Sequence, residues 1–378
     1  MHKISESKPA RWSRDELIEV LRNNGLKEGQ TVAMFSSVGE FGMPDLKGQH
    51  LSQFYLDALF SILGETGVLA MSAFTYSFCS GKDFDPWKDR STVNVIANYC
   101  IDEGIGVRTV DPIFSWVVVT MHDLRLHQQH RLAADAKAQA EGRKYRPFAP
   151  YHCLGHDLEQ EQCEVSQSAA CHAITDSVAA APAQSEYYNI RQIRTTNDTL
   201  RYASPSIVSY LLERNARYLM LGSIHYITFV HYLEHELRSS QRMFKQFTGK
   251  VMTRARGSWE HDGADFSCFY FVRQLCTNTE VNMGRFFLAI CKWPHIWPQD
   301  DVNVRPRFAG RFLCLGPLKY MLDCMRREFA ANELWYCNGP ALTQAQIADM
   351  ESSPWTFDNL EITTWQVIDL SDKRSAAD

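Results

Sequence analysis

Helix-like and strand-like patterns alternate along the first 72 residues, and this alternation restricts the fold more than any other feature of the chain. Ser13-Arg14-Asp15-Glu16 is a capping-box pattern that opens a helix ending at Asn24-Gly25. Residues 31–36 then form a short apolar run typical of a buried strand, residues 51–63 have helical periodicity, and residues 67–71 form a second strand-like run. This order predicts an α/β fold, a three-layer α/β/α sandwich with a largely parallel central sheet.

The rest of the chain continues these patterns with one interruption. We expect further helices at residues 91–103, 121–141, 228–237, 281–291 and 318–330, strands at 114–119 and 217–221, and an antiparallel pair at 250–256 and 266–274. Residues 151–190 lack periodicity and contain six acidic residues with no Lys or Arg. The predicted organisation is therefore an α/β core of residues 1–250 with an acidic insertion at about 146–195, a C-terminal α+β part of 251–350 packed on the core, and a tail of 351–378.

Composition excludes several classes of protein. The formal net charge is 39 − 44 = −5, which argues against a nucleic-acid binder. The N-terminal segment is polar and no apolar run is long enough to span a membrane, so we expect no signal peptide and no membrane partner. Eleven cysteines without CxxC pairs favour a reduced, cytoplasmic protein. The oligomeric state stays open, with a homodimer as one option.

The helix expected at residues 228–237 carries the strongest chemical signal. His231 and Glu234 are three positions apart, so they share a helix face and their side chains can meet. A carboxylate beside an imidazole selects its tautomer and stabilises its protonated form, as a general base requires. Thr228, one turn earlier, adds a hydroxyl to the same face.

Two other interpretations compete for this helix. An exposed His/Glu pair at this spacing is often only a surface charge pair. The segment also spells H-x-x-E-H from His231 to His235, the zinc-protease pattern in which two histidines bind the metal and the glutamate acts as base. Glu260 and Glu280 are the candidates for its third ligand. Within the insertion, Cys153, His156, Cys163, Cys171 and His172 can bind metals, but their spacing matches no standard zinc module.

Several short segments, taken in order, resemble the aminoglycoside 3-N-acetyltransferase (antibiotic N-acetyltransferase) family. The similarity extends from about residue 17 to residue 250, interrupted by the insertion. Its motifs are Phe35-Ser36-Ser37-Val38-Gly39, Met71-Ser72-Ala73-Phe74-Thr75, Phe84-Asp85-Pro86, Ser91, the Arg108–Ser115 segment, Ser204-Pro205 and Thr228-x-x-His231-x-x-Glu234. The residues around Tyr76 and Asp111 resemble members found with surface-polysaccharide sugar genes more than drug-resistance enzymes.

The resemblance implies an acetyl-CoA-dependent N-acetyltransferase that acylates a small-molecule amine, with an amino sugar as the acceptor and no metal. It implies that His231 is the general base, with Glu234 and Thr228 beside it. It places near coenzyme A the residues Ser36, Ser37, Phe74, Thr75 and Ser115, and Ser91 is expected there as well. Arg108 is a candidate for binding the coenzyme A phosphates, with a solvated surface position as the alternative. It places near the acceptor the residues Tyr76, Asp85 and Asp111.

The chain departs from the family pattern at two positions. Phe35 and Asp111 each stand where the family has a histidine. The Asp111 carboxylate can bind the ammonium group of the acceptor, or it can cap the turn before Pro112; both roles stay open. Beside the acetyltransferase hypothesis we carry two others, a zinc metallohydrolase built on His231, Glu234 and His235, and a non-catalytic binding protein of the same fold.

Overall fold

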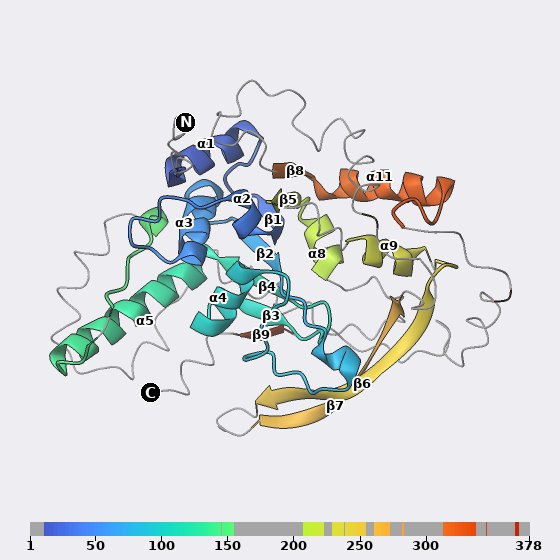
Figure 1. The fold of residues 1–378 in the computed structure, drawn as a ribbon. Helices are drawn as coiled ribbons and strands as arrows, with labels where there is room; N and C mark the ends of the chain where they lie inside the picture. The colour runs from blue at the N-terminus through green and yellow to red at the C-terminus, as the bar shows by residue number, and fades with distance from the viewer. Residues whose placement is uncertain are drawn as a thin grey trace, which may run out of the picture.

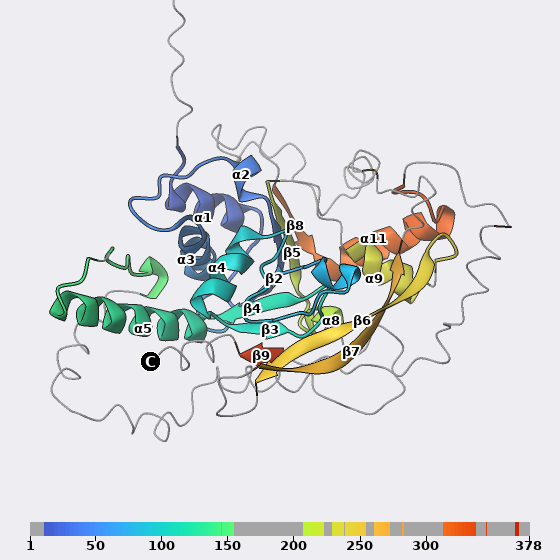
Figure 2. The same ribbon diagram turned by 60° about the horizontal axis from the view of Figure 1, so that its bottom comes forward.

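The computed structural model has a seven-stranded central sheet with helices on both faces (Figures 1 and 2). The structure describes residues 11–144, 146–154, 207–222, 229–237, 239–254, 261–272, 282, 313–337, 345 and 367–369. The strand order in the sheet is β8-β5-β1-β2-β4-β3-β9. These strands are β1 (Thr31–Ser36), β2 (Val68–Ser72), β3 (Val107–Thr109), β4 (Trp116–Thr120), β5 (Arg217–Leu221), β8 (Leu313–Pro317) and β9 (Val367–Asp369).

Parallel pairing is confined to the centre of the sheet. β1 pairs in parallel with β2 on one side and with β5 on the other. All four remaining pairs are antiparallel. A parallel pair needs a crossover of a dozen or more residues. The connection from β3 to β4, residues 110–115, is too short for one, so β4 turns back beside β3 and meets β2 in the antiparallel direction. The α/β fold is as predicted, and its sheet is mixed with a parallel core.

Side chains of alternate residues on the central strands enter two separate cores. On β1, Val32 and Met34 pack toward one face, whereas Ala33 and Phe35 pack toward the other. All six residues of β1 are buried, which explains why the strand reads as an unbroken apolar run. The first face is covered by α1 (Arg14–Asn23), α3 (Leu51–Leu63), α4 (Val95–Glu103) and the start of α5 (Met121–Ala140). The second is covered by α8 (Ile207–Glu213), α9 (Phe229–Glu236) and α11 (Leu318–Ala331).

The expected helix boundaries are largely confirmed, and the local reasons are visible. At the start of α1, Ser13 and Glu16 form the predicted capping box, with the Ser13 backbone N–H donating to Glu16 at 2.7 Å. The helix expected from residue 91 begins at Val95, because the Asn94 side chain accepts the N–H groups of Ile96 and Ala97. Short helical turns are α2 (Val38–Phe41), η1 (Ser77–Ser80) and η2 (His152–Leu154).

The central sheet draws strands from both sides of the predicted boundary at residue 250. β8 pairs with β5, and β9, inside the segment expected to be a tail, pairs with β3 at the sheet edge. The local pattern of β9 is only three residues long, so its place is decided by the open edge of β3 and not by its own sequence. As a division into folding units, the boundary at residue 250 stays a prediction, and most of the insertion and the helix expected at 281–291 lie outside the described residues.

A long antiparallel hairpin forms a second, two-stranded sheet. Its strands, β6 (Met243–Arg254) and β7 (His261–Val272), extend the predicted pair on both sides. The hairpin runs from the region of α9 past η1 toward β3 (Figures 1 and 2). Its apolar side chains, among them Phe247, Val251 and Tyr270, pack with Phe78 and Phe84 in a third core. The hairpin thereby reaches the loops that follow β2 and β3.

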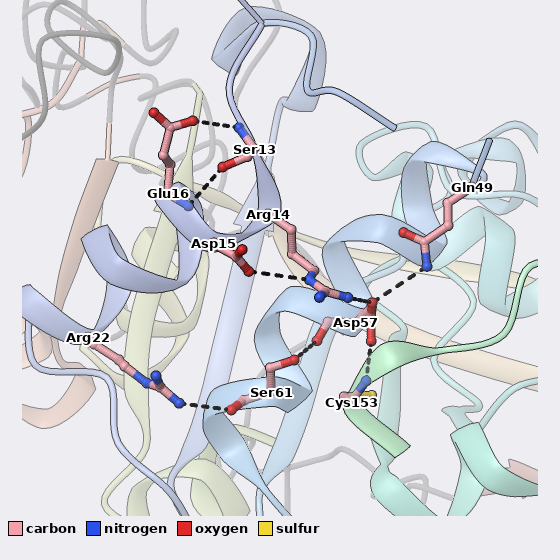
Figure 3. A network of polar contacts seen from close by, with 9 residues as sticks. All are labelled: Ser13, Arg14, Asp15, Glu16, Arg22, Gln49, Asp57, Ser61 and Cys153. Carbon is pink, nitrogen blue, oxygen red and sulfur yellow. Dashed lines mark hydrogen bonds and ion pairs between the residues drawn. The ribbon is translucent and has the colours of Figure 1, made fainter. Parts of the chain in front are cut away.

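A buried carboxylate joins three segments on the first face of the sheet (Figure 3). Asp57 of α3 is fully buried and accepts hydrogen bonds from Arg14 of α1 at 2.6 Å and from the Cys153 backbone N–H at 2.6 Å. Gln49 donates to it at 3.5 Å. Because a buried charge is tolerated only when its partners replace water, this network fixes α1 and residues 149–154 against α3.

We expect Asp57→Asn to lower the free energy of unfolding by about 2–4 kcal/mol, because it removes the charge that Arg14 pairs with and turns one acceptor into a donor. Urea denaturation followed by circular dichroism measures the change. Glu65→Gln is the matched control, since Glu65 pairs with Arg125 at the exposed surface and its loss costs about 0.5 kcal/mol or less. Equal effects of the two substitutions would contradict the role of Asp57.

Candidate functional site

The end of β5 is held tightly against the end of β1. The Ser37 backbone N–H donates to the Leu221 carbonyl at 2.8 Å. Gly222 follows with φ of 88°, and a Cβ atom at this position would collide with the Ser37 carbonyl oxygen. Only glycine tolerates both the left-handed backbone and the close approach. The next residue that the structure describes is Phe229, the first residue of α9.

Phe229 anchors the start of α9 on the second face of the sheet. Its ring is buried, with centroids 5.6 Å from Phe35, 5.8 Å from Trp116 and 5.5 Å from Tyr218. Phe35, which departs from the family histidine, is therefore a core residue. The aromatic packing fixes the rotation of α9 and with it the direction of the polar side chains one turn later.

His231 and Glu234 form the pair expected from their spacing. His231 Nδ1 lies 2.7 Å from Glu234 Oε2. The His231 side chain is 34% exposed, whereas that of Glu234 is fully buried. When Nδ1 carries the hydrogen that faces the carboxylate, Nε2 is the ring nitrogen that can accept a proton.

Glu234 remains ionised across the neutral pH range. Burial by itself raises the pKa of its carboxyl group, but His231, Arg242 and Tyr336 together lower that pKa to about 2. The sign of the linkage follows: the stability gained from these partners is present above the unfolded-state pKa of about 4.3 and is lost as the pH falls toward 2. A carboxylate with this pKa orients an imidazole without competing for its proton.

The exposed side of the pair faces the carboxyl ends of the parallel strands. The His231 ring lies 5.6 Å from the ring of Phe114, two residues before β4, and Phe114 lies 5.2 Å from Phe74, which follows β2. Ligands of open α/β sheets gather at this edge. The expectation that the Ser36-Ser37 and Phe74-Thr75 loops lie at strand ends is confirmed, and the His231 pair adjoins the second of them.

Two of the predicted coenzyme residues near β1 make side-chain hydrogen bonds to the segment that leads into α4. Ser36 is the last residue of β1, is buried, and donates to the side chain of Asn94 at 3.1 Å. Ser37 precedes α2 without a side-chain cap. The Ser91 hydroxyl accepts the Val93 backbone N–H at 3.1 Å. These contacts tie the end of β1 to the start of α4.

A second group of predicted coenzyme residues surrounds a buried arginine. Arg108 is fully buried and donates to the carbonyl oxygens of Ala73, Pro86 and Asp89 and to the Ser115 hydroxyl, at 2.7–3.2 Å. Burial lowers the pKa of Arg108 to about 9. Its donors are directed at the protein interior, so in this structure it braces the loops beyond β2 instead of facing a phosphate.

The remaining members of this group are also bonded locally. Phe74 is buried in the second core. Thr75 donates its hydroxyl hydrogen to the Pro112 carbonyl at 2.6 Å, and Ser115 donates to Ala73 at 2.7 Å. The predicted coenzyme residues therefore shape the strand-end loops through their own hydrogen bonds.

Asp111 is buried, and its contacts match the turn-capping role. One oxygen accepts the backbone N–H groups of Ile113 and Phe114, each at 2.7 Å, and the other accepts the hydroxyl of Tyr270 on β7. Burial raises the pKa of Asp111 to about 6, although these three donors act to lower it. Asp111 thus holds the backbone of Phe114 and joins the β6–β7 hairpin to this turn through Tyr270.

Two further residues predicted near the acceptor differ in exposure. Tyr76 is 46% exposed and its ring lies 6.4 Å from that of Phe114. Asp85 accepts the Trp87 backbone N–H and pairs with Lys88 at 3.4 Å within its own turn.

Thr228 and the side chain of His235 lie outside the described residues. Among the described residues, no three His, Cys, Asp or Glu side chains come close enough to hold a metal ion. In the same part of the chain, no helix combines the length and apolar content needed to cross a membrane.

Three residues of the site were missed from the sequence. Phe114 touches His231, and Arg242 and Tyr336 bind Glu234. Arg242 lies eight positions from Glu234, beyond the end of α9, and Tyr336 lies 102 positions away. Neither position has a local pattern that could have indicated the contact.

We expect the free energy of unfolding of Asp111→Asn, relative to that of the parent protein, to increase as the pH rises from 5 to 8. A group whose pKa is raised in the folded state contributes stability that is present below its unfolded pKa of about 3.9 and is lost as the pH rises through about 6. The amide stays neutral at both values. Thermal unfolding of both proteins across this range measures the difference, and a difference independent of pH would contradict a buried, titrating Asp111.

Known proteins match this chain in three-dimensional structure only. No protein-family model matches the chain, and no curated protein sequence matches it. Among solved structures, AAC-IIIb in a binary complex with CoASH has a TM-score of 0.51 at 13% identity, covering 85% of this chain and 98% of the other. Sisomicin-bound AAC-VIa has a TM-score of 0.50 at 12% identity, covering 85% and 99%. The apoenzyme of aminoglycoside acetyltransferase AAC(3)-IVa has a TM-score of 0.49 at 16% identity, covering 89% and 95%. The chain therefore has the α/β fold of AAC-IIIb and AAC-VIa, as the sequence resemblance implied.

Proposed function

We propose that this protein is an acyl-CoA-dependent N-acetyltransferase that acylates a primary amine of an amino sugar, with His231 as the general base. The observation that carries the proposal is the His231–Glu234 pair at the carboxyl edge of the sheet. His231 Nδ1 lies 2.7 Å from the Glu234 carboxylate, the imidazole is partly exposed, and the carboxylate is buried. A fold shared with a protein bound to CoASH and another bound to sisomicin supports both substrate classes.

The reaction we propose is direct transfer between two bound substrates. The nitrogen of the acceptor attacks the thioester carbonyl, a C–N bond forms, the C–S bond breaks, and CoASH leaves. His231 Nε2 takes the proton that the amine loses and passes it to the departing thiolate sulfur. General-base catalysis of this kind contributes about 10²–10⁴-fold, and holding both substrates together supplies further acceleration.

Glu234 makes His231 an effective base by orientation. Its carboxylate holds Nδ1, so that Nε2 is directed away from the protein interior. Because the low pKa of Glu234 keeps it ionised, it also stabilises the imidazolium that forms while the amine proton is in transit. Thr228 stays a proposed donor beside this pair.

Two buried polar atoms at the same sheet edge favour a polar ligand there. Among the described residues, the Nδ2 group of Asn94, which neighbours Ser36, and the hydroxyl of Ser72, the last residue of β2, have no hydrogen-bond partner. We propose that coenzyme A binds along the loops of Ser36-Ser37, Phe74-Thr75 and Ser91, whose side chains hold the backbone in shape.

The acceptor side of the site combines an exposed aromatic ring with the catalytic imidazole. Phe114 lies beside His231 and the exposed Tyr76 ring lies beside Phe114, so we propose that these rings contact the sugar. The Asp111 carboxylate is occupied by its turn and by Tyr270. We propose that the acceptor is either an aminoglycoside or a nucleotide-linked amino sugar. The first would give the protein a role in antibiotic resistance, and the second a role in polysaccharide biosynthesis in the cytoplasm. Acceptor profiling distinguishes the two. The zinc-hydrolase alternative gains no support, because Glu234 is held by Arg242 and Tyr336 and not left to activate water.

We expect His231→Ala to lower kcat/KM by about 10²–10⁴-fold, because it removes the base while Arg242 and Tyr336 still bind the buried Glu234 carboxylate. Thiol release from acetyl-CoA, measured with separate panels of aminoglycosides and nucleotide-linked amino sugars, gives the rate. Glu234→Gln should lower kcat more than it raises KM, since it misorients the imidazole without removing it.

His122→Ala is the control, because His122 lies exposed on α5, away from the sheet edge. It should keep the activity of the parent protein. Full turnover in His231→Ala would refute the base assignment. Absence of thiol release with every amine, together with no thermal shift on adding acetyl-CoA, would refute the proposed function itself.

A further inference from the structure

The carboxylate of Glu234 binds two partners on the side away from His231. Arg242 Nε lies 2.7 Å from Glu234 Oε1, and the Tyr336 hydroxyl donates to the same oxygen. Arg242 also donates from Nη2 to the Tyr336 oxygen at 3.0 Å. All three side chains are buried. Each oxygen of the carboxylate is therefore held by a different part of the protein, Oε2 by the imidazole and Oε1 by the arginine and the tyrosine.

The two partners come from segments outside α9. A turn after the helix, in which the Ser239 N–H donates to the Glu234 carbonyl at 3.0 Å and the Arg242 N–H to the Ser239 carbonyl at 3.3 Å, brings Arg242 back beneath the helix. Tyr336 lies in the turn after α11. The turn is closed by the Cys337 N–H, which donates to the Leu334 carbonyl at 2.9 Å. The end of the segment 313–337 thus reaches the centre of the site.

Arg242 changes what Glu234 does to the imidazole. A carboxylate paired only with a histidine stabilises the imidazolium strongly, and a base that is already protonated cannot accept a proton from an amine. The guanidinium is permanently charged and lies on the opposite side of the same carboxylate, so it offsets part of that negative charge. It also fixes the carboxylate rotamer that meets Nδ1.

Other charged or titratable groups packed around α9 are already paired elsewhere. Glu236 of α9 forms a two-point ion pair with Arg326 of α11 at 2.7 and 2.8 Å, and Arg326 also binds Asp323. Asp111 and Tyr270 bind one another on the far side of Phe114. Arg242 is thus the cation that shares a carboxylate with His231 among the described residues.

We propose that Arg242, together with Tyr336, is a positioning residue for the general base: it locks the Glu234 carboxylate in the orientation that meets His231 and offsets part of the negative charge of that carboxylate. The proposal rests on the function proposed above. It makes the activity depend on two segments that lie beyond the motif from Thr228 to Glu234.

The test compares pH profiles of kcat/KM for Arg242→Gln, Arg242→Lys and Tyr336→Phe. The acid limb is the low-pH side of the profile, where kcat/KM falls. Loss of the cation in Arg242→Gln should move this limb to higher pH by about one unit, because His231 then faces a carboxylate whose charge is not compensated. Arg242→Lys keeps the charge and should restore the limb to within a few tenths of a unit. Tyr336→Phe is nearly isosteric, removes a neutral donor only, and should move the limb in the same direction by less while lowering kcat.

Arg326→Gln is the matched control, since it breaks an arginine–glutamate pair on the same helix without touching His231. Its acid limb should coincide with that of the parent protein. A loss of structure alone would lower the rate at every pH and leave the limb in place. If Arg242→Gln does not fold, Tyr336→Phe and Arg242→Lys still carry the comparison.

A second readout does not depend on turnover. The ring ¹³Cε1 signal that disappears in His231→Ala identifies His231 by NMR, and its titration midpoint should rise in Arg242→Gln and Tyr336→Phe but not in Arg326→Gln. Unmoved midpoints and unmoved acid limbs in both variants, with His231→Ala inactive, would overturn the role of Arg242 alone. An active His231→Ala would instead overturn the proposed function.

Discussion

The parallel pairing of β1 with both β2 and β5 is the constraint on which the rest of the structure depends. It brings the carboxyl ends of three strands to one edge, and each end leads into a segment of the site: Ser36-Ser37, Phe74-Thr75, and Gly222 before α9. The close approach of Gly222 to the Ser37 carbonyl then leaves little freedom in how the chain departs from β5. The position of His231 on this edge is then fixed by the packing of Phe229 on Phe35, Trp116 and Tyr218.

Buried charges hold the layers around this edge together. Asp57 fastens α1 and residues 149–154 to α3, Arg108 braces the loops beyond β2, and Glu234 joins α9 to the turns at Arg242 and Tyr336. Each of these groups is costly to bury alone and is stable only because several partners converge on it. Such groups specify one arrangement of the segments that meet there, which apolar packing alone would leave less defined.

The main elements could be predicted because their signals are local. The capping box at Ser13 and Glu16, the apolar runs of β1 and β5, and the helical spacing of α3 are all contained within single segments. β8 and β9 were not predicted, because a short strand with no alternation is defined by the edge that it joins. The antiparallel flanks likewise follow from the short connection between β3 and β4 and from pairing partners far apart in sequence.

The sequence by itself determined the pair at the centre of the candidate site, because residues three apart on a helix share a face whatever the helix packs against. It also determined the α/β architecture through its periodicity. Only the tertiary structure decided what surrounds that pair: that Arg108 and Asp111 are directed at the interior, that Phe114 lies on His231, and that Arg242 and Tyr336 bind Glu234. The physical reason is that the burial of a charge, and the partners that compensate it, depend on which distant segments converge there, and no local pattern encodes that convergence.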